Sequence, residues 1–186
     1  MNNYFVKNIL KLGGFMNFKD IEVKINKPYP EINDAEEDFQ TVGILKNLVS
    51  SRMGELAGVM QYIYQSVIAD KTNEEIAEIF EEIGVVEMIH LDILMHAITL
   101  FGGNPKYEDS HGNFFNTANL NYTMKLKDML DNNVKAENMS IENYKQAISR
   151  VRNQSLKDLL SRIIEDEERH VEIFKQIRDS VQFMSI

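Results

Sequence analysis

Cysteine is absent from this chain of 186 residues. A disulfide bond, a thiolate metal ligand and a Cys-x-x-Cys electron-transfer module are therefore excluded. Proline and glycine are scarce, with three and nine residues, and most of them lie near the N-terminus or between residues 102 and 112. Because these two residues interrupt helices, the rest of the chain offers long stretches that can be helical.

Basic residues are fewer than acidic ones, 20 against 29, which gives a formal net charge of −9. This balance argues against nucleic acid or an anionic membrane as a partner. We identify no stretch apolar enough to span a membrane. The N-terminal run over residues 4–16 is interrupted by Lys7 and Lys11 and lacks a small-residue cleavage site. We therefore expect no signal peptide and a cytoplasmic protein.

The pattern of apolar residues predicts one helical domain behind an N-terminal arm. Residues 1–33 are irregular, with an extended stretch over 21–25 that alternates apolar and polar residues. The domain covers residues 34–182 and divides into four helices: 34–69, from the turn at 70–73 to 101, 119–152, and 155–182. The expected start and stop signals are Asp34 before the first helix, Thr72 or Asn73 before the second, and Gly102 with Pro105 after it.

The connections between the helices predict the topology. The turns at residues 70–73 and near Asn153 are short, so each joins antiparallel neighbours. Residues 102–118 form the one long connection, which can cross the bundle between the second and third helices. The predicted fold is therefore an all-α four-helix bundle with one long crossover and an extended N-terminal arm.

Two Glu-x-x-His pairs, Glu87/His90 and Glu167/His170, lie in the second and fourth predicted helices. Glu and His three residues apart share one face of a helix, so both can reach one metal ion. The first and third helices each carry an acidic residue before a pair, and these are Glu55 and Glu137. The order Glu, Glu-x-x-His, Glu, Glu-x-x-His is the ligand set of a carboxylate-bridged dinuclear site in a four-helix bundle.

These acidic residues lie on the helix faces that periodicity assigns to the core. The stripe of the second helix is apolar from Ile76 to Phe101 except at its Glu and His, and the fourth helix has the same interruption between Leu156 and Ile177. A buried, unpaired carboxylate is costly. Arg52 is the one basic residue on the four stripes, so two divalent metal ions, manganese or iron, are the expected counter-charge. The alternative is a structural salt-bridge network.

One tyrosine and two further histidines are the other polar candidates for a role at this site. Tyr62 lies two turns after Glu55 on the same face, where it is either a hydrogen-bond donor or redox-active residue beside the metals, or a core tyrosine. His96 lies off the stripe of the second helix and His111 lies in the long connection, so both are expected to be solvated.

The arrangement resembles the ferritin-like superfamily, which includes bacterioferritins, rubrerythrins and manganese catalases. Residues 52–66, RMGELAGVMQYIYQS, and the arm from Ile21 to Pro30 are similar to manganese catalases, and the chain length is similar to that of small catalase-like proteins of spore coats. Ala136-Glu137 with Tyr144, and residues 166–170, DEERH, resemble bacterioferritins and rubrerythrins. The segment around Glu87 fits both.

The resemblance implies roles for the ligands. Glu55 and His90 would complete one metal position, Glu137 and His170 the other, and Glu87 would bridge them. Glu167 would be either a second bridge, as in ferritins, or a base beside the metals, as in catalases.

The resemblance also implies partners and a location. Met88 matches the haem-ligating methionine of bacterioferritin, but without a cage-type dimer no haem is expected. A homo-oligomer is expected, and the spore becomes an alternative location.

Three functions follow from these expectations. The leading one is a non-haem dinuclear metalloenzyme that disproportionates hydrogen peroxide, as a manganese catalase does. The second is a di-iron ferroxidase or peroxidase of the bacterioferritin or rubrerythrin type, acting on dioxygen or peroxide and able to store iron. The third is a structural coat protein that retains a metal site.

Overall fold

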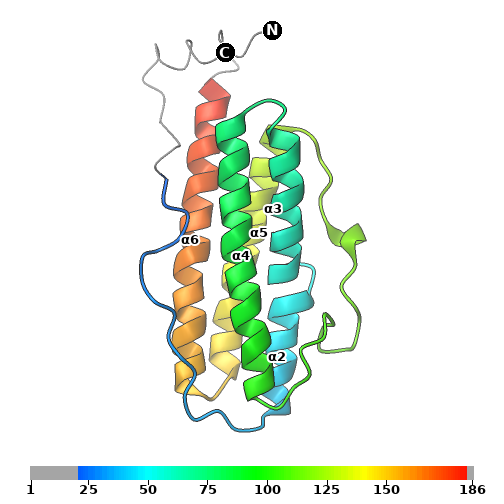
Figure 1. Cartoon of the computed structure of the whole chain (residues 1–186), viewed down its shortest axis with the longest axis vertical. Helices are drawn as coiled ribbons and strands as arrows, with labels where there is room; N and C mark the ends of the chain where they lie inside the picture. The colour runs from blue at the N-terminus through cyan, green and yellow to red at the C-terminus, as the bar shows by residue number, and fades with distance from the viewer. Residues whose placement is uncertain (1–20, 184–186) are drawn as a thin grey trace.

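The computed structural model describes residues 21–183, and these fold into a four-helix bundle (Figure 1). Two collinear helices make up the first long helix, and three further helices complete the bundle. In chain order they are α2, Phe39–Ser50; α3, Glu55–Ala69; α4, Glu74–Leu100; α5, Leu126–Arg150; and α6, Gln154–Phe183. The all-α bundle with one long crossover between the second and third helices is therefore confirmed.

The first long helix differs from the prediction at its start and in its middle. It begins after Asp38 instead of Asp34, because the Asp38 side chain accepts hydrogen bonds from the backbone N–H groups of Gln40 and Thr41. The prediction of one continuous helix over 34–69 is also wrong, because residues 51–54 leave the helical path. Gly54 makes this break possible: a Cβ atom there would lie 2.5 Å from the carbonyl oxygen of Leu48.

The boundaries of α4 follow the expected signals. Of the two caps considered, Asn73 is the one that caps the helix, and its side chain accepts from Ile76 N–H. At the other end Gly102 has a φ of 82°, a value that favours glycine, and Gly103 N–H bonds back to the carbonyl of Ile98 at 2.8 Å.

The long connection runs along the first helix from one end of the bundle to the other (Figure 1). Lys46 of α2 pairs with Glu108 of the connection at 2.5 Å. Gln61 of α3 and the backbone of Asn121 exchange two hydrogen bonds of 2.8 and 2.7 Å. These contacts hold the chain against α3 past residue 119, with the 3-10 turn η2, Thr117–Asn119, inside it. The third long helix, α5, consequently starts at Leu126 and not at 119.

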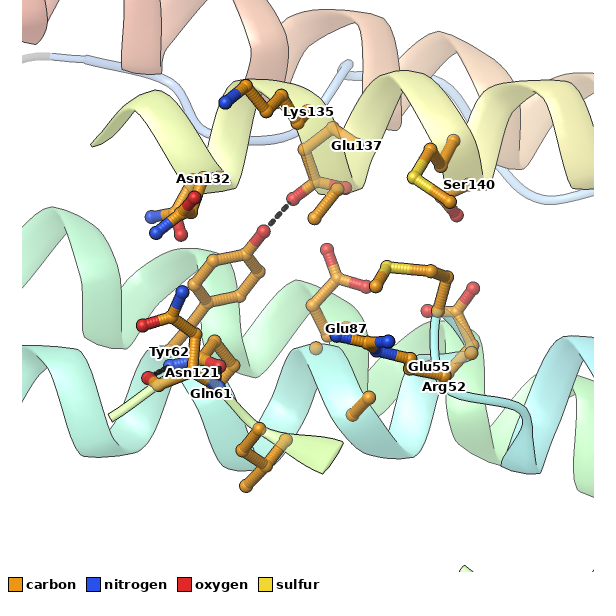
Figure 2. A pocket seen from close by; sticks show the side chains of 18 of the residues that line it. Arg52, Glu55, Gln61, Tyr62, Glu87, Asn121, Asn132, Lys135, Glu137 and Ser140 are labelled. Carbon is orange, nitrogen blue, oxygen red and sulfur yellow. Dashed lines mark hydrogen bonds between the residues drawn. The ribbon is translucent and has the colours of Figure 1, made fainter. Parts of the chain in front are cut away.

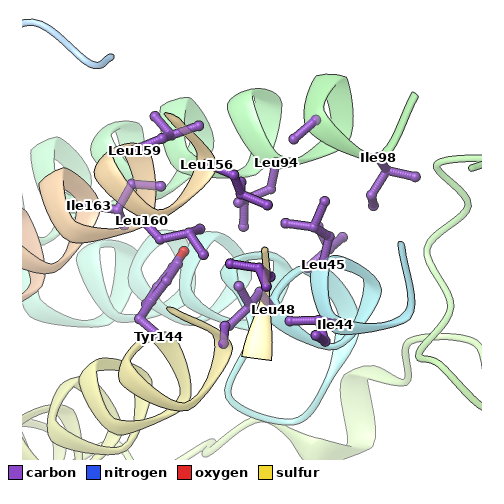
Figure 3. Close-up of a cluster of buried hydrophobic side chains, with 14 of the residues drawn as sticks. Ile44, Leu45, Leu48, Leu94, Ile98, Tyr144, Leu156, Leu159, Leu160 and Ile163 are labelled. Carbon is purple, nitrogen blue, oxygen red and sulfur yellow. The ribbon is translucent and has the colours of Figure 1, made fainter. Parts of the chain in front are cut away.

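Two clusters of buried apolar side chains lie along the bundle. One contains Leu45, Leu94 and Leu160 (Figure 3), and the other contains Phe80 and Phe174. On α4 and α6 the Glu-x-x-His pairs fall between residues of the first cluster and residues of the second. The polar site therefore lies in the middle of the bundle with apolar packing on both sides.

The arm over residues 21–33 lies against α6 (Figure 1) without forming a strand. The extended stretch expected over 21–25 is irregular, because its polar backbone groups bond to side chains of α6 and not to another strand. Ile25 N–H donates to Asp166 at 2.7 Å, and Arg162 donates to the carbonyl of Ile25 at 2.6 Å. Residues 1–20, including the run considered as a signal peptide, lie outside the described residues.

Helix α4 corrects the expectation that no stretch is apolar enough to span a membrane. It is long and apolar enough by length and composition alone. About half of its most apolar stretch is buried inside the bundle. A core helix of a folded bundle meets the same criterion, so the feature is weak evidence for a membrane span.

Candidate metal centre

Four carboxylates and two imidazoles from α3, α4, α5 and α6 meet at the centre of the bundle. They form two groups, in each of which the candidate ligand atoms all lie within 4.8 Å of one another. One group is Glu55, Glu87, His90 and Glu167; the other is Glu87, Glu137, Glu167 and His170. All six residues are at least 96% buried. The structure thus brings together the six residues that the sequence singled out.

The two groups share Glu87 and Glu167. Glu87 directs one carboxylate oxygen to His170 Nδ1 at 3.0 Å and the other to His90 Nδ1 at 3.8 Å. Glu167 directs its oxygens to the same two nitrogen atoms, at 3.2 Å to His90 and 3.5 Å to His170. Glu167, for which a bridge and a base are both expected roles, thus faces both imidazoles.

Most of the inward-facing atoms have no hydrogen-bond partner. The atoms concerned are Glu55 Oε2, Glu87 Oε1, both carboxylate oxygens of Glu167, His90 Nδ1, and both ring nitrogens of His170. Buried polar atoms are normally hydrogen-bonded. Here they approach one another at 3.0–3.9 Å without hydrogen-bond geometry. The donor set of carboxylate oxygen and imidazole nitrogen therefore fits a pair of divalent ions.

Glu55 and Glu137 each belong to only one of the two groups. Both carboxylates favour the neutral form. Burial, together with the neighbouring Glu87 carboxylate, holds the pKa of Glu55 well above its usual value. Burial and the Glu167 carboxylate raise the pKa of Glu137 in the same way. Both positions therefore favour a cation or a proton beside the carboxylate.

The shared carboxylates have the opposite tendency. Burial favours the neutral form of Glu87 and Glu167, but interactions with the two imidazoles outweigh it and lower the pKa of each. Burial also opposes charge on His170, yet the same carboxylates raise its pKa to about 9. The shared carboxylates thus favour the protonated form of His170. Metal ions bind the neutral imidazole, so a metal ion and a proton would compete for this ring.

Two tyrosines cross the bundle to the outer carboxylates. The hydroxyl of Tyr62 on α3 donates to Glu137 on α5 (Figure 2), and the hydroxyl of Tyr144 on α5 donates to Glu55 on α3. Each tyrosine follows the glutamate of its own helix by seven residues. The sequence pattern on α3 indicated Tyr62, and the same spacing on α5 is the signal that would have indicated Tyr144 in this role.

Asp166 and Arg162 were not identified from the sequence. Asp166 is fully buried, and its Oδ2 lies 3.2 Å from His90 Nε2. Arg162, one turn earlier on α6, pairs with the other carboxylate oxygen at 2.9 Å. The i,i+4 spacing of Arg and Asp is a local signal, but an exposed helix face carries it as often.

A pocket of about 200 Å³ leads to the site between α3 and α5 (Figure 2). At its inner end lie Glu55, Glu87, Tyr62 and Glu137. Small residues at the start of α3, amide side chains from α3, α5 and the crossover, and several apolar residues line much of the rest. These are Gly54, Ala57, Gly58, Gln61, Asn119, Asn121, Asn132, Asn133, Met53, Leu120, Ala136 and Met139. Arg52 and Lys135 are its basic residues. The pocket therefore leads from the surface to Glu87, one of the two shared carboxylates.

The remaining candidates lie away from this centre. The side chain of His96 is 74% exposed and contacts Asp92 of its own helix. His111 is exposed in a turn of the long connection. Met88 is 48% exposed on α4, on the outside of the bundle.

The fold and the paired Glu and Glu-x-x-His helices define a ferritin-like bundle with the residues of a dinuclear metal–carboxylate centre. The chain belongs to the rubrerythrin family, whose model matches residues 46–178. A comparison with curated protein sequences gives no significant match.

Solved structures share the fold at low sequence identity. The manganese catalase KatB from Anabaena is 22% identical, with a TM-score of 0.77, over 87% of this chain and 81% of the catalase chain. Bacterioferritin from Rhodobacter capsulatus is 20% identical, with a TM-score of 0.67, over 77% of this chain and 86% of its own. Bacterioferritin from Desulfovibrio desulfuricans is 21% identical, with a TM-score of 0.64, over 77% and 80%.

Proposed function

We propose that this protein is a non-haem dinuclear metal oxidoreductase that disproportionates hydrogen peroxide. The observation that carries the proposal is the pocket whose inner end presents Glu87, which belongs to both ligand groups, beside Glu55 and Glu137. The similarity in fold to a manganese catalase supports it. In this reaction one peroxide takes up two electrons and two protons and gives two waters, while another gives up two electrons and two protons and forms dioxygen.

The ligand residues would hold two ions side by side. Glu55 and His90 would complete one position, Glu137 and His170 the other, and Glu87 and Glu167 would contribute to both. Two ions that each change oxidation state by one electron supply the two-electron chemistry of peroxide. The chain's own contribution is a fixed ligand geometry in a dry core and a short approach for the substrate. It contains no cysteine-based electron donor, and disproportionation needs none.

The pocket lining supports a small neutral substrate. The carboxylates among its lining residues are Glu55, Glu87 and Glu137, all of them candidate ligands. Elsewhere the lining presents amides, small and apolar residues, Ser140, and the basic residues Arg52 and Lys135. Positive charge along the approach disfavours the repeated entry of ferrous ions, whereas hydrogen peroxide is uncharged and hydrogen-bonds to amides. This difference favours peroxide turnover over iron storage.

The test is oxygen evolution from hydrogen peroxide without any reductant, on protein loaded with manganese or with iron. Rapid evolution from the manganese form, lost in Glu87→Ala, is the expected result. Tyr107→Phe, on an exposed tyrosine of the connection, serves as a matched control that keeps full activity. If neither metal form evolves oxygen although two ions are bound, the proposal is wrong.

A di-iron peroxidase or ferroxidase is the second candidate, and the position of Glu167 favours it. Both oxygens of this carboxylate face the two imidazoles without hydrogen-bond partners, as a bridging ligand requires. Consumption of peroxide that depends on an added electron donor, or rapid oxidation of iron(II) by dioxygen, would support this function in place of disproportionation.

A further inference from the structure

The N-terminal arm contacts the metal centre through Asp166. We propose that arm residues Ile25 and Tyr29 hold Asp166 in place, that Asp166 in turn orients His90, and that the two metal positions therefore differ in affinity. The position served by Glu55 and His90 is the tighter one. This inference rests on the proposed dinuclear site and concerns metal binding, not turnover.

Asp166 is held from four directions although it is fully buried. Its Oδ1 accepts Ile25 N–H at 2.7 Å and pairs with Arg162 at 2.9 Å. Its Oδ2 accepts the hydroxyl hydrogen of Tyr29 at 2.7 Å and lies 3.2 Å from His90 Nε2. Two of the four partners belong to the arm, so the arm supplies half of the groups that position this carboxylate.

Arg162 and the ring of Tyr29 fix the arm against α6. Arg162 donates to the backbone carbonyls of Ile25 and Lys27 at 2.6 and 3.0 Å. Its guanidinium lies 4.7 Å from the centre of the Tyr29 ring, which is a favourable cation–π distance. The same ring meets His90 edge-on, with centroids 5.8 Å apart. The arm thus contacts His90 directly as well as through Asp166.

His170 has no comparable support. It is fully buried, and within residues 21–183 its Nε2 has no hydrogen-bond partner. A carboxylate that accepts a hydrogen bond from a metal-bound imidazole fixes the ring and makes it a stronger ligand, and removing such a partner lowers metal affinity by about 10- to 100-fold. His90 has this partner and His170 lacks it, which makes the two positions unequal.

Tyr29→Phe tests the proposal, because it keeps the ring and removes the hydroxyl donated to Asp166. Manganese(II) titrations, followed by electron paramagnetic resonance and by metal analysis, measure both affinities. We expect about 10-fold weaker binding of one ion and unchanged binding of the other, at the lower end of the range for outer partners of a ligating histidine. Lys27→Met is the matched control: it removes the exposed pair of the arm with Glu165 at 2.9 Å and leaves Asp166 untouched.

Combining Tyr29→Phe with a variant that disables one metal position shows which of the two ions it weakens. In Glu137→Ala, which disables the His170 position, Tyr29→Phe should weaken the remaining ion. In Glu55→Ala, which disables the His90 position, it should have no effect. Equal weakening in both backgrounds, or no weakening in either, would overturn the inference.

A second variant, Asp166→Asn, keeps the volume of the side chain and removes its charge. Its thermal unfolding shows whether the variant is folded, so that weaker metal binding is not confused with misfolding. Asp166→Asn should weaken the same ion more than Tyr29→Phe does, and a folded variant that binds both ions as the wild type does would overturn the inference. A wild-type protein that binds fewer than two ions would overturn the proposed function. Two ions bound with affinities insensitive to Tyr29→Phe would leave the function standing and overturn the inference alone.

Discussion

Glu87 of α4 and Glu167 of α6 each turn one carboxylate oxygen toward His90 Nδ1 and the other toward His170 Nδ1. Each of these glutamates therefore belongs to both ligand groups, while Glu55 and Glu137 belong to one group each. This relationship makes the two halves of the site interdependent. It also gives different expectations for loss of a shared and of an unshared ligand.

Loss of a shared carboxylate should destroy the metal pair. We expect Glu87→Ala and Glu167→Ala to bind at most one ion tightly, because each removes a ligand from both positions. Metal analysis and the magnetic coupling of the manganese ions measure this. A Glu167→Ala protein that keeps two coupled ions and loses only turnover would show that Glu167 acts as a base and not as a bridge. An active Glu87→Ala protein with two coupled ions would contradict the ligand assignment itself.

The hydrogen bonds from Tyr62 to Glu137 and from Tyr144 to Glu55 should stabilise the fold to a similar degree. Tyr62→Phe and Tyr144→Phe each remove a buried hydroxyl donor to a glutamate. A hydrogen bond to a charged group contributes about 1.5–3 kcal/mol. We expect a loss of this order in the unfolding free energy of the metal-loaded protein, measured by denaturant titration. Tyr107→Phe, on an exposed ring, should cost far less. Equal losses in all three variants would contradict the role of the buried pair.

Gly58 should control the access of peroxide to the shared carboxylate Glu87. A Cβ atom at this position would lie 3.2 Å from the Glu87 side chain in a pocket that leads to it. Gly58→Ala should lower kcat/KM for peroxide by about 10-fold or more, since displacing a reacting group by about 1 Å can cost about 100-fold. The matched control is Gly43→Ala in α2, where a Cβ atom would meet Ser110 at an ordinary 3.6 Å. If Gly58→Ala retains full activity, substrate does not approach along this wall.

Asp38 should make the start of α2 sensitive to pH. Its carboxylate accepts hydrogen bonds from Thr41 and Gln40. The hydrogen bond from the Thr41 hydroxyl makes the largest contribution to lowering the pKa of Asp38, and the one from the Thr41 backbone makes the next largest. A lowered folded-state pKa means that the stabilisation is present above the unfolded pKa of about 3.9 and is lost as pH falls through the folded value.

Asp38→Ala should therefore lower the unfolding free energy by about 0.5–2 kcal/mol near neutral pH. Asp38→Asn keeps a capping oxygen without the titration. The difference between wild type and Asp38→Asn, measured by denaturant titration across pH 2–7, should shrink toward acid pH. A difference that does not change with pH would contradict the pKa direction.

The helix boundaries show where the local sequence pattern is sufficient to predict the structure. The sequence predicts a cap at Thr72 or Asn73 and a stop at Gly102-Gly103, because a cap needs only its own helical turn, and the structure shows Asn73 as the cap. The late start of α5 at Leu126 was not predicted, because residues before it are held by α3 through Gln61, 60 positions earlier in the chain. The break at residues 51–54 was missed for a related reason. The inward-facing stripe keeps its helical spacing through the break, with Arg52 on it, so periodicity predicts a continuous helix.

The sequence by itself determined the four-helix architecture and the six inward-facing candidate ligand residues. Helical periodicity places Glu and His three residues apart on one face, and a stripe of apolar residues assigns that face to the core. The tertiary structure decided which carboxylates are shared, which tyrosine reaches which glutamate, and how the arm reaches His90 through Asp166. These contacts join residues 75–141 positions apart. No repeat of 3.6 residues encodes them, because they arise only when the packed helices fix distant side chains beside one another.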